Sequence, residues 1–223
     1  MSELLKFAEG RLQEAALVFM AVVYTLRILW LLKFKAGKER QAATGVEGTT
    51  PKKGIVYSWA NIFMPWAMES TRKKFIMWLQ FGVFHTAVTL SIIMSFIIPY
   101  LPGVMEYTIV VRGLQGLFAA AFLVGCYRIY RRLSDPFMRA ISSPDDYFSL
   151  TLITVWFAFA FLAAPNKSAT ALLIYFFMTA FFLMYVPFSK ISHYLYYPFT
   201  RYYFGKSMGY RGVYPIKHVS ESK

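Results

Sequence analysis

The sequence predicts an all-α integral membrane protein, a bundle of five transmembrane helices, and three observations lead to this fold class. Of the 223 residues, 57% are hydrophobic and only 16% are charged, which is more apolar side chain than a soluble domain of this size buries. The basic residues are concentrated in particular connecting segments, as in membrane proteins of defined topology. Five apolar runs have lengths suited to a bilayer crossing, at about residues 15–33, 75–98, 108–127, 148–164 and 169–197.

We assign these runs to one transmembrane domain, residues 1–205, followed by a tail, residues 206–223. Basic residues follow the first run and do not precede it, which argues against a cleavable signal. Residues 33–74 hold nine Lys and Arg, whereas the two loops expected outside hold one, Lys167. The positive-inside rule therefore predicts an outer N-terminus and a cytoplasmic C-terminus. This topology accounts for the net charge of +13, so we expect membrane lipid and no nucleic acid as a partner.

The segments around the second and third runs differ in character. Residues 36–54 are polar and rich in Gly and Thr, and we expect an exposed loop. The apolar stretch 55–68 is too short to span a bilayer, and its two tryptophans and central proline are typical of a segment in the membrane interface. In the third run, Gly116 and Ala120 are four residues apart, a spacing that allows close contact between helices.

The fourth and fifth runs carry helix-boundary signals. The sequence Ser-Pro-Asp-Asp at 143–146 supplies a capping hydroxyl, a proline for the first turn and two carboxylates for the positive end of the helix dipole. The fifth run is expected to continue as one helix to Tyr197, with Pro187 as an internal kink. Such a kink would help to aim His193 inward.

Two histidines lie within apolar runs, His85 in the second and His193 near the end of the fifth. Titratable side chains are costly inside a membrane and often mark function. Both are predicted in the cytoplasmic half of the bundle, where two imidazoles could be the axial ligands of one haem iron. Hydrogen bonding between helices is the alternative. The single cysteine, Cys126, excludes a CxxCH attachment and a thiolate-held iron–sulfur cluster. The third histidine, His218, is expected to be solvated.

Other residues near these histidines could contact a haem. Gly82 lies on the same helix face as His85 and leaves room for a flat macrocycle, although a packing glycine would look the same. Basic side chains at the cytoplasmic ends of two runs could pair with haem propionates, namely Lys190, Arg128, Arg131 and Arg132. For Lys190, a simple positive-inside anchor is the alternative.

A second polar pair stands about one turn into the third run from its outer end. Arg112 is followed three residues later by Gln115, which places both on one helix face. Arg112 can extend its side chain to the outer headgroups. The alternative is an outer-leaflet pocket for a quinone headgroup formed by Arg112 and Gln115.

Across residues 10–200, the chain resembles the cytochrome b (gamma) subunit of respiratory nitrate reductase. It also resembles its relatives in heterodisulfide-reductase-like and sulfite-reduction-associated membrane complexes. Three features carry the resemblance. They are Phe84-His85, the pattern Arg131, Arg132, Pro136, Arg139, Ser142 and Asp145, and Pro187-Phe188-Ser189-Lys190 with His193.

The resemblance implies that the second and fifth helices hold b haems between paired histidines. His85 and His193 match the pair nearer the cytoplasm. Where the outer pair would stand, this sequence has Ser95 and a position near Tyr175, which are not usual haem ligands. We therefore expect one haem b and not two.

The resemblance further implies an electron-transfer subunit of a membrane oxidoreductase in a prokaryotic cytoplasmic membrane. It would exchange electrons with a quinone or similar carrier and with a cytoplasmic iron–sulfur subunit of heterodisulfide-reductase-like or nitrate-reductase-beta-like type. This chain alone would hold no complete active site. Basic loops would attract an acidic partner face.

Three other hypotheses remain open at this point. The chain could be a haem-free membrane anchor, or a two-haem cytochrome in which Met94 or Met178 supplies an axial ligand. A transporter lacks support, because the runs contain no acidic residue for ion coupling and no pair of interrupted helices.

Overall fold

The computed structural model describes residues 2–34, 37, 40–42, 48–67 and 69–215. Within these residues the chain is all-helical, with 84% helix and no strand. Five segments are long and apolar enough to cross a membrane, which confirms the predicted fold class: Glu3–Leu32, Phe75–Tyr100, Thr108–Ser134, Pro144–Ala163 and Ala169–Phe188.

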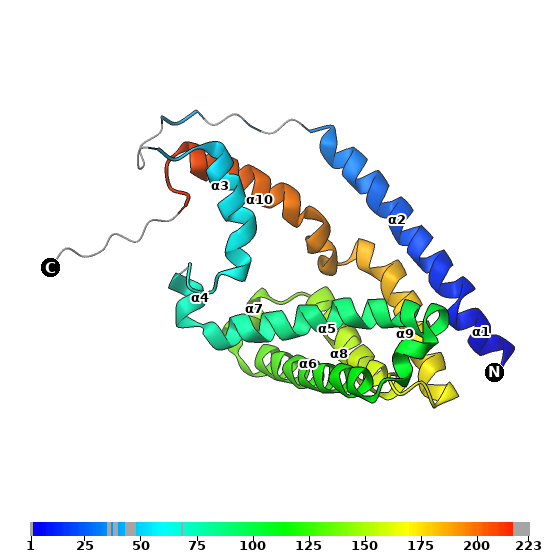
Figure 1. Ribbon diagram of the computed structural model, residues 1–223. Coiled ribbons are helices and arrows are strands. Elements are labelled where there is room, and N and C mark those ends of the chain that lie inside the picture. The colour runs from blue at the N-terminus through cyan, green and yellow to red at the C-terminus, as the bar shows by residue number, and fades with distance from the viewer. Residues whose placement is uncertain (1, 35–36, 38–39, 43–47, 68, 216–223) are drawn as a thin grey trace. The chain divides into compact units, whose positions relative to one another are not determined.

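Figure 1 labels the α-helices along the chain, from α1 near the N-terminus to α10. The α-helices are α1 (Glu3–Glu9), α2 (Arg11–Leu32), α3 (Pro51–Ala60), α4 (Glu69–Lys73), α5 (Phe75–Tyr100), α6 (Thr108–Ser134), α7 (Pro136–Ile141), α8 (Pro144–Ala163), α9 (Ala169–Tyr185) and α10 (His193–Tyr210). The 3-10 turns are η1 (Asn61–Phe63), η2 (Pro102–Glu106), η3 (Val186–Phe188) and η4 (Lys190–Ser192).

The chain divides into two compact units, which are described separately. The first unit comprises Met1–Arg27 and Leu79–Ser192, and the second comprises Ile28–Trp78 and His193–Lys223. Residues 216–223, which make up much of the predicted tail and include His218, lie outside the described residues.

The predicted start of α8 is confirmed. Ser143 is the N-cap residue, Pro144 opens the helix and both aspartates stand in its first turn. The backbone N–H of Ser143 donates to Asp146 Oδ2 at 2.8 Å, as in a capping box. The cap therefore fixes where the chain enters this membrane-length helix.

The fifth apolar run is not one continuous helix. α9 ends at Tyr185, two 3-10 turns follow, and α10 begins at His193. Pro187 lies in the first of these turns, because proline has no N–H to continue the helical ladder. The prediction of a single helix through Tyr197 is therefore wrong in this segment.

A different glycine from the expected one brings α6 close to its neighbour. Gly116 and Ala120 are both exposed, and a Cβ added at Gly116 would meet nothing within 4 Å. At Gly125, an added Cβ would instead clash with the side chain of Thr154 on α8, including its Cγ2 at 2.9 Å. The close contact predicted at Gly116 and Ala120 is therefore wrong, and α6 approaches α8 closely at Gly125, nine residues further along the helix.

The core of the first unit is an aromatic cluster between α8, α9 and α5. Trp156 is fully buried and its indole stacks on Phe182, with ring centroids 4.8 Å apart. Trp156 Nε1 donates to Thr179 Oγ1 at 2.8 Å, so the polar edge of the indole is satisfied inside the core. Aromatic burial on this scale is the main source of side-chain packing in the unit.

The second unit is organised by a glycine crossing between α3 and α10. A Cβ at Gly205 would lie 2.6 Å from the carbonyl oxygen of Gly54 and 2.8 Å from Ser58 Cβ. Only glycine permits so close an approach of two helix backbones. Trp59 Nε1 also donates to the carbonyl of Pro198 at 3.1 Å. Residues 36–54 were expected to form an exposed loop. In the structure α3 begins at Pro51, so the last four residues of that range are helical.

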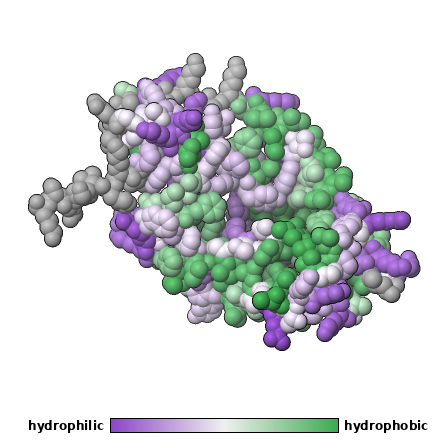
Figure 2. Space-filling view, viewed as in Figure 1, coloured by the Kyte–Doolittle hydropathy of each residue, from purple (hydrophilic) through white to green (hydrophobic). Residues whose placement is uncertain are grey.

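The surface of the membrane-length helices is largely apolar. In Figure 2, hydrophobic residues cover much of the visible face over α5 and α6, and hydrophilic residues gather toward its edges. Large apolar side chains such as Ile76, Ile93, Ile109 and Leu123 are exposed there. An apolar outer surface is what a helix facing lipid requires.

Candidate functional site

His85 lies in α5 and its imidazole is held by its own helix. Nδ1 lies 2.8 Å from the carbonyl oxygen of Phe81. A carbonyl can only accept, so Nδ1 carries the proton and the neutral ring has its lone pair on Nε2. Metal-binding histidines commonly fix their tautomer through such a bond to a carbonyl. The Phe81 ring packs on the imidazole, with centroids 4.0 Å apart.

Gly82 stands one turn before His85 on α5. A Cβ added there would meet nothing within 4 Å. The packing alternative for this glycine is therefore not supported by the described residues, since no neighbouring helix approaches it. The role of Gly82 beside a haem stays a prediction.

Arg128 lies beside the same part of α5. Its guanidinium carbon is 5.3 Å from the centre of the Phe84 ring, within the range of a cation–π contact. Phe84 is buried and packs edge-on against Phe157 of α8 at 5.2 Å. The arginine is thus held near the helix that carries His85 by an aromatic ring.

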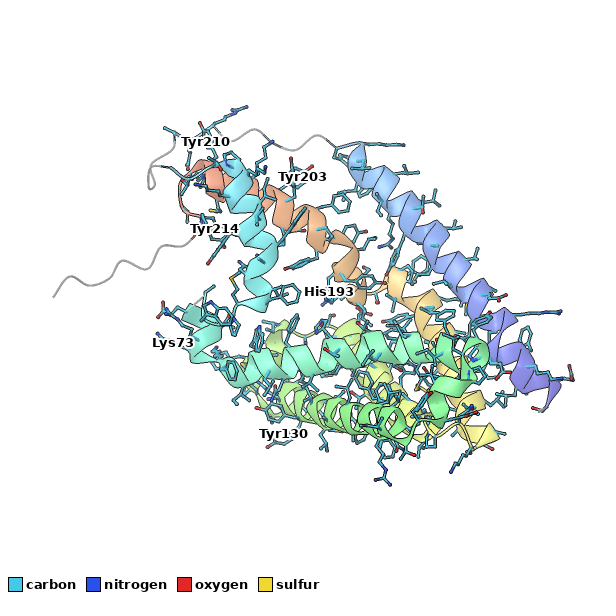
Figure 3. All side chains as sticks on the ribbon, in the orientation of Figure 1. Lys73, Tyr130, His193, Tyr203, Tyr210 and Tyr214 are labelled. Carbon is cyan, nitrogen blue, oxygen red and sulfur yellow. The ribbon has the colours of Figure 1, made fainter. Side chains whose placement is uncertain are left out.

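His193 is the first residue of α10 and belongs to the second unit. Figure 3 labels it at the start of this helix. Its side chain is exposed, and its ring lies 6.5 Å from that of Tyr194, centre to centre. His85 belongs to the first unit, so the pairing of these two histidines as ligands stays a prediction.

Lys190 is engaged by the first turn of α8. Its Nζ lies 2.6 Å from Asp146 Oδ2 and 2.8 Å from Ser143 Oγ. Arg132 approaches the same carboxylate at 3.9 Å and donates to Ser142 Oγ at 2.5 Å. The structure therefore gathers two of the predicted propionate-binding cations around one acidic residue, and their role toward a haem stays a prediction.

The neighbouring carboxylate, Asp145, receives a second set of bonds. The backbone N–H of Lys190 donates to Asp145 Oδ2 at 3.0 Å. The Tyr185 hydroxyl donates to Asp145 Oδ1, and Ser149 Oγ donates to the same oxygen at 3.3 Å. From the sequence, both aspartates were expected only to complement the helix dipole. The sequence signal for a further role is the place of Asp145 in the arginine-rich pattern that carries the family resemblance.

The remaining predicted site residues are not gathered into a pocket by the described residues. Arg112 is exposed on α6. Gln115 Nε2 donates to the carbonyl of Phe161 on α8 at 3.2 Å, so this amide links two helices. Arg131 is partly buried near the end of α6. The assignment of Arg112 and Gln115 to a quinone pocket stays a prediction.

The positions that correspond to an outer haem pair are filled by packed side chains. Ser95 and Tyr175 are both fully buried. The Tyr175 hydroxyl donates to the backbone carbonyl of Ser91 on α5, and Ser95 Oγ donates to the carbonyl of Ile92 at 2.7 Å. A macrocycle between α5 and α9 at this level would have to displace Tyr175.

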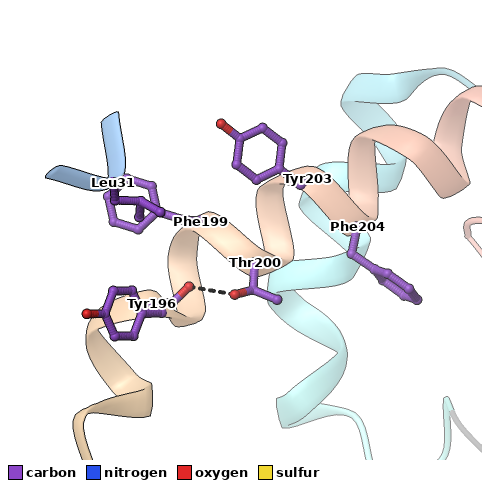
Figure 4. Close-up of a pocket in the computed structure, with 6 residues that line it drawn as sticks. All are labelled: Leu31, Tyr196, Phe199, Thr200, Tyr203 and Phe204. Atoms are coloured by element: carbon purple, nitrogen blue, oxygen red, sulfur yellow. Dashed lines mark hydrogen bonds between the residues drawn. The ribbon is translucent and has the colours of Figure 1, made fainter. Parts of the chain in front are cut away.

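The second unit has an open groove along α10. Five residues of this helix and Leu31 of α2 surround a space of about 490 Å³: Tyr196, Phe199, Thr200, Tyr203 and Phe204. Figure 4 shows Thr200 Oγ1 bonded back to the carbonyl of Tyr196, at 2.9 Å. The groove thus presents mainly aromatic rings.

No cluster of three or more His, Cys, Asp or Glu side chains suited to a metal ion occurs in the described part of the chain. A haem iron needs only two protein ligands. Compared with known proteins, the chain matches no family model, no curated protein and no solved structure.

Proposed function

We propose that this chain is the membrane-anchoring b-type cytochrome subunit of an oxidoreductase complex. It relays electrons between a membrane quinone, or a similar carrier, and a cytoplasmic iron–sulfur subunit. One haem b is held by His85 and His193. The observation that carries the proposal is the imidazole of His85, whose Nδ1–H donates to the carbonyl of Phe81 at 2.8 Å, a bond by which metal-binding histidines commonly fix their tautomer.

The residues around His85 fit a haem. The open space at Gly82 leaves room for a macrocycle against α5, and Arg128 supplies a positive charge from α6 that can pair with a propionate. When bound, a bis-imidazole haem accepts and donates single electrons without an open coordination position. The chain holds and orients the cofactor and surrounds it with low-dielectric side chains.

The packing further along α5 supports one haem per chain. Tyr175 bridges α9 to the carbonyl of Ser91, and Met94, one of the two alternative thioether ligands, is fully buried in the same packed region. A second haem there would need a cavity that these side chains occupy. The alternative of a two-haem cytochrome therefore loses support.

The direction of insertion follows from charge. Nine basic residues between positions 33 and 74 favour a cytoplasmic location for that segment. The N-terminus is then outside and the C-terminus inside a prokaryotic cytoplasmic membrane. The same basic segments attract an acidic face of the iron–sulfur partner and raise the rate of encounter.

The test is the reduced-minus-oxidised absorption spectrum of the purified protein from haem-replete cells. His85→Ala and His193→Ala should each remove the sharp bands of a low-spin b haem. His218→Ala is the matched control and should keep them, because this histidine belongs to the polar tail of the sequence. Full band intensity in both of the first two variants would show that the ligand assignment is wrong.

Haem stoichiometry separates the alternatives. A pyridine haemochrome assay should give one haem per chain in the unmodified protein. A ratio of two would establish a second haem with a non-histidine ligand. A colourless protein that still co-purifies with iron–sulfur subunits would identify a haem-free anchor.

A further inference from the structure

The α-helical hydrogen-bond pattern is interrupted between α9 and α10, over residues 186–192. A helix end leaves backbone N–H and C=O groups without helical partners. Near a membrane such groups must find partners within the protein. Four residues of this short stretch are buried, Val186, Pro187, Ser189 and Ser192, whereas Phe188 and Lys190 are exposed.

Serine side chains satisfy part of this backbone. Ser189 Oγ donates to the carbonyl of Val186 at 3.1 Å and accepts from the N–H of Ile191 at 3.2 Å. Ser192 Oγ donates to the carbonyl of Ser189 at 2.8 Å. These bonds hold the two 3-10 turns in shape, but they lie within the segment and do not attach it to another helix.

Asp145 provides the attachment. Its Oδ2 accepts the backbone N–H of Lys190 at 3.0 Å, and its Oδ1 accepts the Tyr185 hydroxyl from the end of α9. Asp145, at the start of α8, thus bonds to Tyr185 just before the break and to the backbone N–H of Lys190 within it.

We propose that Asp145 is a positioning residue for His193. The chain runs from the anchored N–H of Lys190 through η4 directly into His193, so the carboxylate fixes the backbone from which this imidazole projects. The inference rests on the proposed function, in which His193 is an axial ligand. It gives one structural role to Asp145, from the arginine-rich sequence pattern, and to Ser189-Lys190, which precede His193.

The test compares Asp145→Asn with Asp146→Asn. The amide that replaces the carboxylate in Asp145→Asn keeps one acceptor oxygen and loses the negative charge, which weakens the bond from the Lys190 N–H. Asp146 carries the same charge one residue later. Its carboxylate is 16% exposed and accepts from the backbone N–H of Ser143 and from the Lys190 side chain, whereas the backbone N–H of Lys190 donates to Asp145. The control therefore removes equal charge from the same helix turn and leaves the backbone anchor in place.

The first readout is the low-field EPR signal of the ferric haem, which depends on the angle between the two imidazole planes. Asp145→Asn should shift this signal. It should also speed the transfer of haem to apomyoglobin about 10-fold, which is the lower end of the effect expected for a residue that orients a metal ligand. Asp146→Asn should leave the signal in place and change the rate of haem loss by about 3-fold at most.

The second readout needs no haem. In haem-free protein, hydrogen exchange at the Lys190 amide should be about 10-fold faster in Asp145→Asn than in Asp146→Asn, because its bond loses the charged acceptor. Equal exchange in the two variants would overturn the anchor. Should Asp145→Asn fail to accumulate, Tyr185→Phe removes one donor to the same carboxylate and should give the same EPR shift, smaller in size.

The outcomes separate the two proposals. Loss of the haem bands in His193→Ala together with an unchanged EPR signal in Asp145→Asn would leave the cytochrome proposal standing and overturn the positioning role. Retention of the bands in His193→Ala would overturn the ligand assignment itself, and the positioning role with it.

Discussion

The two halves of α5 differ in how the protein surrounds them. From Phe75 to Val83 none of the side chains is buried, and Gly82 faces open space. From Phe84 to Ile98 the helix buries a residue on every turn, and Tyr175 of α9 bonds directly to its backbone. His85 lies at the boundary between these halves.

In the proposed function, this difference would let one helix separate a packing surface from a cofactor surface. Where large aromatic side chains fill the space between helices, no further group can enter without a loss of packing. Where a glycine and a half-buried histidine stand at the edge of that packing, a planar ligand can lie against the helix. Substitutions in and around each half of α5 test this difference.

The largest effect is expected for Trp156→Ala in the packed half. Removal of this fully buried indole should lower the free energy of unfolding by about 3–5 kcal/mol, through lost burial and the remaining cavity. Denaturant titration of the detergent-solubilised protein measures it. Trp30→Ala is the control, since that side chain is 61% exposed and should cost about 0.5 kcal/mol or less.

The haem ratio should be unchanged in the folded fraction of Trp156→Ala. A small destabilisation, similar to that of Trp30→Ala, would mean that this half is not tightly packed. The argument that packing excludes a second haem would then lose its basis.

Several features of the fold were predictable because they depend on local sequence. Hydropathy and length located five membrane-length helices, since an apolar run must be long to cross a bilayer. The start of α8 at Pro144 followed from its capping sequence. These features need no knowledge of which helices are neighbours.

Features that depend on neighbours were missed or misplaced. Gly116 and Gly125 both stand four residues from a small residue (Ala120 and Ala121), and only the second faces another helix. The break after Tyr185 includes Pro187, which was expected only to kink a continuous helix, and whether a proline kinks or ends a helix depends on the packing around it. The role of Asp145 depends on Lys190, which is 45 residues later in the chain.

The second prediction compares two glycines. Gly125→Leu should lower the free energy of unfolding by about 1–3 kcal/mol, because its side chain would overlap Thr154 in a packed contact. Gly82→Leu should change stability by about 0.5 kcal/mol or less and yet reduce haem content, since its side chain would occupy the space proposed for the macrocycle. Denaturant titration and the pyridine haemochrome assay measure the two effects on the same preparations.

Two results would contradict this comparison. If Gly82→Leu binds haem at the level of the unmodified protein, the macrocycle does not lie against this face of α5. If Gly82→Leu is as unstable as Gly125→Leu in haem-free protein, the open half is packed after all.

The smallest effect is expected for Tyr175→Phe, which tests whether the bridge across the packed half is an ordinary hydrogen bond. The ring remains in place, and only the bond from the Tyr175 hydroxyl to the Ser91 carbonyl is lost. Net contributions of such bonds are about 1 kcal/mol, so the denaturation midpoint should fall slightly, with haem content and spectrum unchanged. Tyr203→Phe on α10, with its side chain 43% exposed, serves as the control. A change in the haem spectrum of Tyr175→Phe, absent from that control, would place a cofactor in contact with the half of α5 that packing is argued to fill, because loss of one hydroxyl in a closed core has no other route to the iron.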